Sequence, residues 1–213
     1  MKIICAEAGP ILTNCYVIID YNKNNALIVD CAFDGADSLF EILDKHKVKL
    51  DATILTHSHW DHSGDAMELH RKTGAPVLVH KDDEYRLLEP NKNTIMQLPF
   101  EIEAIKPHKY LEHGEIFSFN DIDFEVRHTP GHTEGSICLV NHKEKVVFAG
   151  DTIFNQSIGR TDLPGGSTEL ILNSIREQLM TLNDSYKVYC GHGPSTTIGE
   201  ERRNNPFLTG IFF

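Results

Sequence analysis

The sequence of 213 residues has no long hydrophobic run and few basic residues. No apolar stretch approaches the ~20 residues that a membrane-spanning helix needs. The N-terminus, MKIICAEAG, lacks the apolar core of a secretion signal. Twenty Lys and Arg stand against 31 Asp and Glu, which gives a formal net charge of -11. This balance disfavours nucleic acid and anionic membranes as partners, whereas a metal ion or a local arginine can still attract a small anionic substrate.

Paired cysteine motifs are also missing. The five cysteines form no Cys-x-x-Cys pair and most lie in apolar runs, so we expect buried, reduced thiols at Cys5, Cys15, Cys31, Cys138 and Cys190. Together with the missing secretion signal, this predicts a cytoplasmic protein. The composition is otherwise that of a globular protein, and we expect one domain over residues 1–213.

Short apolar runs alternate with segments of helical spacing along the chain. The runs predict strands at 15–19, 26–30, 52–56, 76–79, 115–119, 123–128, 136–141, 145–149 and 187–190, the last strand of the chain. The helical spacing predicts helices at 35–47, 65–72, 81–88 and 168–182. Each half starts with strands and continues with helices. This order favours two sheets packed together with helices outside over one doubly wound sheet.

The segment THSHWDHSGD, residues 56–65, concentrates three histidines and an aspartate in six positions: His57, His59, Asp61 and His62. Histidine is costly to cluster because it is polar and titrates near neutral pH. Three later strands are each followed by a similar residue beside glycine, namely His132, Asp151 and His192. Sites are commonly built at the ends of strands, where the scaffold is rigid and the loops are free. We therefore expect all these side chains to converge on one edge of the sandwich.

The residue types indicate a metal centre. Imidazole and carboxylate are the ligands of zinc and similar divalent ions in catalytic sites. Five histidines and two aspartates are too many for one tetrahedral ion and suit two ions bridged by a carboxylate and a hydroxide. We expect the remaining histidines to be surface or hydrogen-bonded residues: His46, His70, His80, His108, His113, His128 and His142.

With these motifs the sequence resembles the metallo-β-lactamase-fold hydrolase superfamily, and within it the short, single-domain bacterial members of the glyoxalase II-like (hydroxyacylglutathione hydrolase-like) branch. The resemblance extends from Asn14-Cys15-Tyr16-Val17 to Asn205-Pro206-Phe207. It implies an α/β (α+β) fold, a four-layer αβ/βα sandwich of two mixed sheets with helices outside. It also implies that Asp30, in Asp30-Cys31-Ala32 where the family usually has Asp-Pro-Gly, supports a metal ligand from behind.

The resemblance implies a ligand set as well. One metal would be held by His57, His59 and His132, the second by Asp61, His62 and His192, with Asp151 bridging the two. The implied ions are divalent, Zn²⁺ first, with Fe or Mn as alternatives. They would lower the pKa of a bridging water, and the resulting hydroxide would attack a thioester or ester carbonyl. Asp61 would also orient that water, which makes it a catalytic residue.

The implied activity is therefore glyoxalase II-like hydrolysis of small acyl thioesters or esters, with an anionic thioester as one expected substrate. Longer relatives hold glutathione with a further C-terminal helical segment, whereas this chain ends about twenty residues after His192. Thioester hydrolysis is thus expected, whereas the use of glutathione stays open. The oligomeric state, monomer or dimer, stays open.

Single features of the sequence favour or disfavour other classes of protein. The loop Gly159-Arg160-Thr161-Asp162 also resembles persulfide dioxygenases, which share the fold and use one non-haem iron, here held by His57, His132 and Asp151. Arg160 would bind an anion near the site in either enzyme, or would instead brace its loop through Asp162 or backbone carbonyls. A regulatory module with a degenerate site is disfavoured by the full ligand set. A nuclease is disfavoured by the acidic charge, and a true β-lactamase by Asp151, where those enzymes tend to have Cys or Ser.

Overall fold

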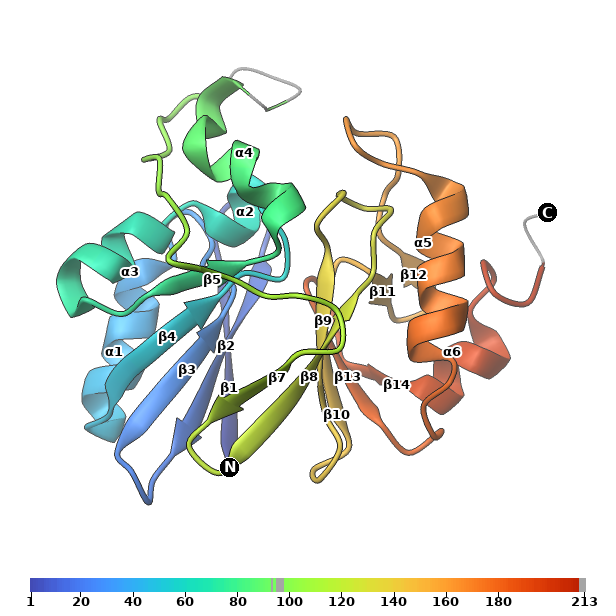
Figure 1. Ribbon diagram of the computed structural model, residues 1–213, viewed down its shortest axis with the longest axis horizontal. Coiled ribbons are helices and arrows are strands. Elements are labelled where there is room, and N and C mark those ends of the chain that lie inside the picture. Colours follow the sequence, from blue (N-terminus) through green and yellow to red (C-terminus); the bar gives the residue numbers. More distant parts are fainter. Residues whose placement is uncertain (93, 95–97, 211–213) are drawn as a thin grey trace.

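A computed structural model, which describes residues 1–92, 94 and 98–210, contains two six-stranded mixed sheets with helices on their outer faces (Figure 1). The first sheet runs in the order β1 (Lys2–Ala8), β2 (Thr13–Asp20), β3 (Asn25–Val29), β4 (Lys49–Ile54), β5 (Val77–Val79) and β6 (Lys109–Tyr110). Its first three strands are antiparallel, whereas β3 to β6 pair in parallel. The strands predicted at 15–19 and 26–30 are thus confirmed as β2 and β3, which pair antiparallel.

The second sheet follows in the later half of the chain. Its order is β14 (Thr196–Thr197), β13 (Lys187–Cys190), β10 (Val146–Gly150), β9 (Ile137–Asn141), β8 (Ile122–His128) and β7 (Ile116–Phe119). A small hairpin of β11 (Ile153–Phe154) and β12 (Ser157–Ile158) lies apart from it. Because β8 and β10 both pair antiparallel with β9, and β10 pairs parallel with β13, the C-terminal ends of β8, β10 and β13 share one edge.

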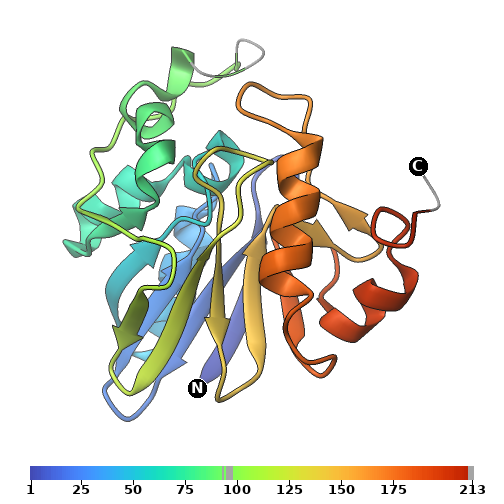
Figure 2. The same ribbon diagram turned by 45° about the vertical axis from the view of Figure 1, so that its right-hand side comes forward.

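Helices cover the outer face of each sheet. Against the first sheet pack α1 (Ala36–His46) and α3 (Ala66–Thr73), through Leu39 and Leu69. Against the second pack α5 (Thr168–Ser174), which continues as the π-helical segment Ile175–Leu179, and α6 (Ile198–Asn204). Figure 2 shows α5 along the outer face of the second sheet. The short helices are α2 (Trp60–Ser63), η1 (Lys81–Asp83), α4 (Glu84–Leu88) and η2 (Pro90–Lys92).

A buried apolar core joins the inner faces of the two sheets. It includes Ile18, Leu27 and Ile54 from the first sheet and Phe124 and Phe148 from the second. Together with the two outer cores, this gives the four layers expected of an αβ/βα sandwich. The central strands are buried on both faces, and for this reason they read as continuous apolar runs rather than as alternating ones.

Several elements were not predicted: β1, β6, β11, β12, β14, α2, η2 and α6. The strand at 187–190 is not the last one, because β14 pairs with it antiparallel. The start of α6 has a signal, since the Thr197 side chain accepts a hydrogen bond from the Glu200 backbone N–H. The other missed strands are two residues long or, like β1, lie at a sheet edge where burial does not impose a pattern. Among the described residues, none of the helices combines the length and the apolar character needed to cross a membrane.

Candidate metal centre

Four loops meet where strands of both sheets end. His132, Asp151 and His192 follow β8, β10 and β13, whose C-terminal ends lie at one edge of the second sheet. His57 and His59 follow β4 of the first sheet, and the short helix α2 then presents Asp61 and His62. The structure thus brings together all the ligand-type residues that the motifs predicted, four from the first half of the chain and three from the second.

Hydrogen bonds between the sheets hold these loops in register. The backbone N–H of Ile137 donates to the Thr56 carbonyl at 2.8 Å. The loop before His192 is tied to β2, because Tyr16 Oη donates to the Cys190 carbonyl at 2.6 Å and Asn14 Nδ2 donates to the same carbonyl at 3.0 Å. Gly191 leaves no room for a side chain, since a Cβ there would collide with Asp151 Oδ1. Glycine therefore permits the close approach of this loop.

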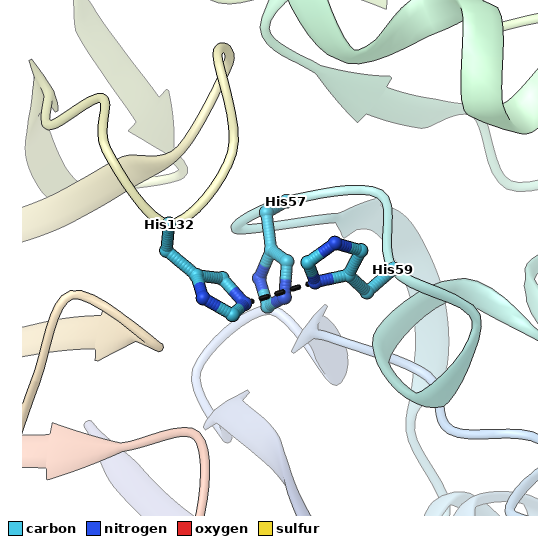
Figure 3. Close-up of side chains that lie close together, drawn as sticks. All are labelled: His57, His59 and His132. Atoms are coloured by element: carbon cyan, nitrogen blue, oxygen red, sulfur yellow. Dashed lines mark hydrogen bonds between the residues drawn. The ribbon is translucent and has the colours of Figure 1, made fainter. Parts of the chain in front are cut away.

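The first group of donors consists of His57, His59 and His132, whose rings point toward one another (Figure 3). His59 Nδ1 lies 2.9 Å from His132 Nε2. His132 Nδ1 is 2.8 Å from the Arg160 carbonyl, so that nitrogen carries the proton and Nε2 is left with a lone pair toward the group. His57 Nε2 is buried and has no hydrogen-bond partner. A buried imidazole nitrogen without a partner is costly, and this one needs a ligand.

The second group consists of Asp61, His62 and His192. His192 Nε2 lies 3.2 Å from both Asp61 Oδ2 and His62 Nε2. Asp151 lies between the two groups, with Oδ1 3.2 Å from His62 Nε2 and Oδ2 3.5 Å from His132 Nε2. Asp151 is therefore within reach of both groups, and its bridging role stays a prediction of the family resemblance.

The acids and imidazoles of this cluster strongly affect one another's protonation. Burial lowers the pKa of His59 to about 3, and it holds the pKa of His57 well below its usual range. Burial alone would also lower the pKa of His62, but the carboxylates of Asp151 and Asp61 raise it well above its usual range. The buried acids thus draw positive charge into the cluster, and a divalent ion would supply it.

The residues present fit a metal centre. The donors are imidazole nitrogens and carboxylate oxygens, the set used by zinc, iron and manganese in catalytic sites. One donor nitrogen is buried without any other partner. The described residues include three groupings in this cluster in which all donor atoms lie within 4.8 Å of one another. Divalent metal binding is therefore the chemistry that this arrangement suits.

Asp30 lies behind the cluster, as the resemblance implied. Its Oδ2 is 2.8 Å from His62 Nδ1, and the same carboxylate accepts hydrogen bonds from the backbone N–H and the hydroxyl of Thr56. The Thr56 hydroxyl is in turn 3.1 Å from His57 Nδ1. Asp30 thereby fixes the ring of His62 directly and that of His57 through Thr56, the common arrangement of a carboxylate behind a metal-ligating histidine.

The Arg160 guanidinium is exposed and donates two hydrogen bonds of 2.8 Å to the Asp162 carboxylate. Of the two roles expected for this residue, the structure favours the bracing one. Its backbone contributes as well, through the carbonyl that accepts from His132.

Asp83, which is fully buried in η1, was not predicted from the sequence as a residue of the site. Its carboxylate accepts hydrogen bonds from the backbone N–H of Ser58 at 2.7 Å, the Thr133 hydroxyl at 3.0 Å and the backbone N–H of Gly135 at 2.7 Å. Ser58 stands between two of the candidate ligands and Thr133 follows a third, so Asp83 joins the loops from the two sheets. No motif surrounds it in the sequence, and only its partners reveal its role.

Comparison with known proteins agrees with this geometry. Residues 8–192 match the Metallo-beta-lactamase superfamily. A curated relative, the "Hydroxyacylglutathione hydrolase GloC" of Haemophilus influenzae, is 39% identical over 198 residues, which is 92% of each chain. A crystal structure described as "BLEG-1 B3 metallo-beta-lactamase" is 38% identical with a TM-score of 0.91, covering 98% of this chain and 100% of that one. The structure of "ETHE1 from Myxococcus xanthus" is 26% identical with a TM-score of 0.79, covering 99% and 85%.

Proposed function

The chain belongs to the metallo-β-lactamase superfamily, and from this premise we propose that it is a dinuclear metal hydrolase that cleaves thioesters or esters of small acyl compounds. The observation that carries the proposal is the pair of three-residue donor groups with Asp151 between them. The name of the Haemophilus influenzae relative supports the same chemistry, because a hydroxyacylglutathione is a thioester.

The donor groups would each hold one divalent ion, Zn²⁺ first. When bound, such ions lower the pKa of water and polarise a carbonyl oxygen. Asp61 lines the cavity above the cluster and has its Oδ2 3.2 Å from His192 Nε2, so its carboxylate can accept a proton from an attacking water and orient it. His132 is held by the Arg160 carbonyl and His62 by Asp30, which keeps both rings fixed while a substrate is bound.

A second function, persulfide dioxygenation at one iron, is favoured by one observation. His57, His132 and Asp151 form two imidazoles and one carboxylate in close proximity, and the Myxococcus xanthus ETHE1 structure resembles the chain over 99% of its length. The further donors of the same cluster argue against a dioxygenase, because a single iron site does not need them. They are His59, Asp61, His62 and His192. We therefore place the hydrolase first.

The test is a joint measurement of metal content and reactivity on protein purified without added metal. We expect about two ions per chain by plasma mass spectrometry, together with hydrolysis of model thioesters. About one iron per chain, with oxygen uptake on a persulfide and no thioester cleavage, would overturn the proposal. A β-lactam is a useful third substrate because of the likeness to BLEG-1, and β-lactam cleavage without thioester cleavage would also contradict it. The variant His142→Gln is the matched control, since its ring bonds Glu125 and Tyr186 away from the cluster.

A further inference from the structure

A cavity of about 610 Å³ opens above the seven His and Asp donors of the candidate metal centre, called the metal cluster below. Its floor is the cluster itself, with His59, Asp61, Asp151 and His192. Its walls are largely apolar and are formed by Ile11, Trp60, Leu98, Phe154, Ile158 and Leu163. A pocket of this size takes a small organic molecule, and its lining favours an apolar one.

Aromatic side chains stand on both sides of the donors. Trp60 follows His59 in the sequence, and its ring packs 5.5 Å from Phe100, which stacks on Phe33 with ring centroids 3.8 Å apart. On the other side, the Phe154 ring lies 6.1 Å from the His192 ring at an angle of 70°. These contacts hold the apolar walls in place next to the position where a carbonyl would react. A substituent attached to that carbonyl would therefore pack against them.

The charges around the cavity do not suit a substrate with several carboxylates. Among the described residues that line it, the cations are Arg86 and Arg160. Arg160 is engaged with Asp162. Arg86 is buried and donates to Glu134 at 2.7 Å, to the Pro164 carbonyl at 2.8 Å and to Asp83 at 3.3 Å. Both guanidinium groups thus already have acceptors within the protein, and the net charge of -11 repels an anion at longer range.

We propose that this cavity selects neutral thioesters with a bulky apolar substituent beside the scissile bond. Thioesters of an acidic peptide thiol such as glutathione would be poorer substrates. The inference rests on the proposed hydrolase function and narrows its substrate class. It also differs from the anionic thioester expected from the sequence. The apolar substituent can belong to the acyl group or to the thiol, and the test separates these two sources.

The first measurement compares kcat/KM over two series of neutral thioesters. One series varies the acyl group from acetyl to hexanoyl and phenylacetyl on N-acetylcysteamine, and the other varies the thiol on a constant acetyl group. Burying each added methylene should raise kcat/KM about threefold in one series until the cavity is filled. S-lactoylglutathione should be at least about tenfold poorer than the best neutral substrate. Flat series, or S-lactoylglutathione as the better substrate, would refute the inference while leaving the hydrolase function intact.

A second measurement separates the inference from the activity itself. Trp60 is the one tryptophan of the chain, so its fluorescence reports directly on the cavity. The probe is the ketone analogue of the hexanoyl thioester, in which CH₂ replaces sulfur. Saturable quenching gives the dissociation constant of the ketone. A dissociation constant at least about tenfold higher for Phe154→Ala than for the unmodified protein supports an apolar subsite even if no thioester is cleaved. The matched control is Ile116→Ala, an exposed apolar side chain on β7, which should leave the binding unchanged. Absence of binding, or equal binding in Phe154→Ala, would overturn the inference.

Discussion

Histidine rings lie together at several places in the described part of the chain, including His70 and His108, and two other places differ in how the rings meet. At the metal cluster the ring of His132 is nearly perpendicular to those of His57 and His59, at 79° and 87°. The ring edges, where the nitrogen lone pairs lie, therefore converge. At the other place His80 and His128 stack face to face, with centroids 4.0 Å apart and planes 13° apart. These two rings and Asp82 also form a group whose donor atoms lie within 4.8 Å of one another, but the rings are parallel rather than perpendicular.

The hydrogen bonds also distinguish the stacked pair His80 and His128 from the metal cluster. His80 Nδ1 accepts from the Asp82 backbone N–H at 3.3 Å, and His128 Nε2 donates to the Glu134 carbonyl at 2.8 Å. Asp82 lies near the pair, but its side chain is 56% exposed. The metal cluster, in contrast, contains a buried nitrogen without a partner. A group of ligand-type residues therefore becomes a metal centre through ring orientation and unsatisfied buried donors, and their number alone is not enough.

The largest effect is expected from Asp151→Asn, which removes the carboxylate between the two donor groups. Removing one partner from a buried charged cluster costs about 3–5 kcal/mol, so metal affinity and turnover should fall by about two to four orders of magnitude. Chelator competition and plasma mass spectrometry measure the metal, and thioester cleavage measures turnover. If the variant keeps its metal content and its rate, Asp151 does not bridge the cluster.

A smaller loss is expected from Asp30→Asn, because Asp30 contacts the ring of His62 and not the metal position. Loss of such a supporting carboxylate typically costs 10–100-fold in metal affinity. The measurement is chelator competition on folded variant protein, with circular dichroism as the control for folding. An affinity equal to that of the parent would show that Thr56 and the backbone hold His62 and His57 without Asp30.

The third change tests whether Asp83 positions the loops of the cluster. Asp83→Asn weakens the hydrogen bonds that Ser58, Thr133, Gly135 and Arg86 donate to a buried carboxylate, and a hydrogen bond to a charged group contributes about 1.5–3 kcal/mol. We expect the free energy of unfolding to fall by about 2–3 kcal/mol in urea, with a loss of metal affinity. The neighbouring Asp82→Asn is the matched control, since its side chain is exposed, and should change stability by less than about 0.5 kcal/mol. Equal losses of unfolding free energy in the two variants would show that Asp83 stabilises the protein no more than an exposed carboxylate does.

The smallest effect concerns the stacked pair. Burial, and then the nearby His128, lower the pKa of His80 below its usual range. The folded protein therefore binds fewer protons at His80 than the unfolded chain does, and this site loses stability as the pH falls below the usual histidine value. His128→Gln should raise the pKa of His80, which NMR titration of the ring proton measures. A pKa that stays unchanged would mean that burial alone sets it.

The sequence predicted the candidate site better than it predicted the edges of the fold. The seven donors were found because each follows a strongly apolar strand and stands in a short motif with glycine or further histidines. Neither signal exists for Asp83, whose partners Ser58, Thr133 and Gly135 lie 25, 50 and 52 positions away. The two-residue strands have no periodicity to detect, and the α6 helix could have been found only from its Thr197–Glu200 cap. The cavity is also invisible in the sequence, since Ile11, Trp60 and Phe154 come from a turn, from α2 and from β11.

The division of donors between the halves of the chain has a consequence for fragments. A cut in the connection between β6 and β7 would give one piece with His57, His59, Asp61 and His62 and another with His132, Asp151 and His192. Each donor group takes two residues from the first piece and one from the second, so neither fragment holds a complete group. The ties from Tyr16 and Asn14 to the loop before His192 also cross this division. Metal uptake by the mixed fragments, and by neither fragment alone, would thus report their reassembly.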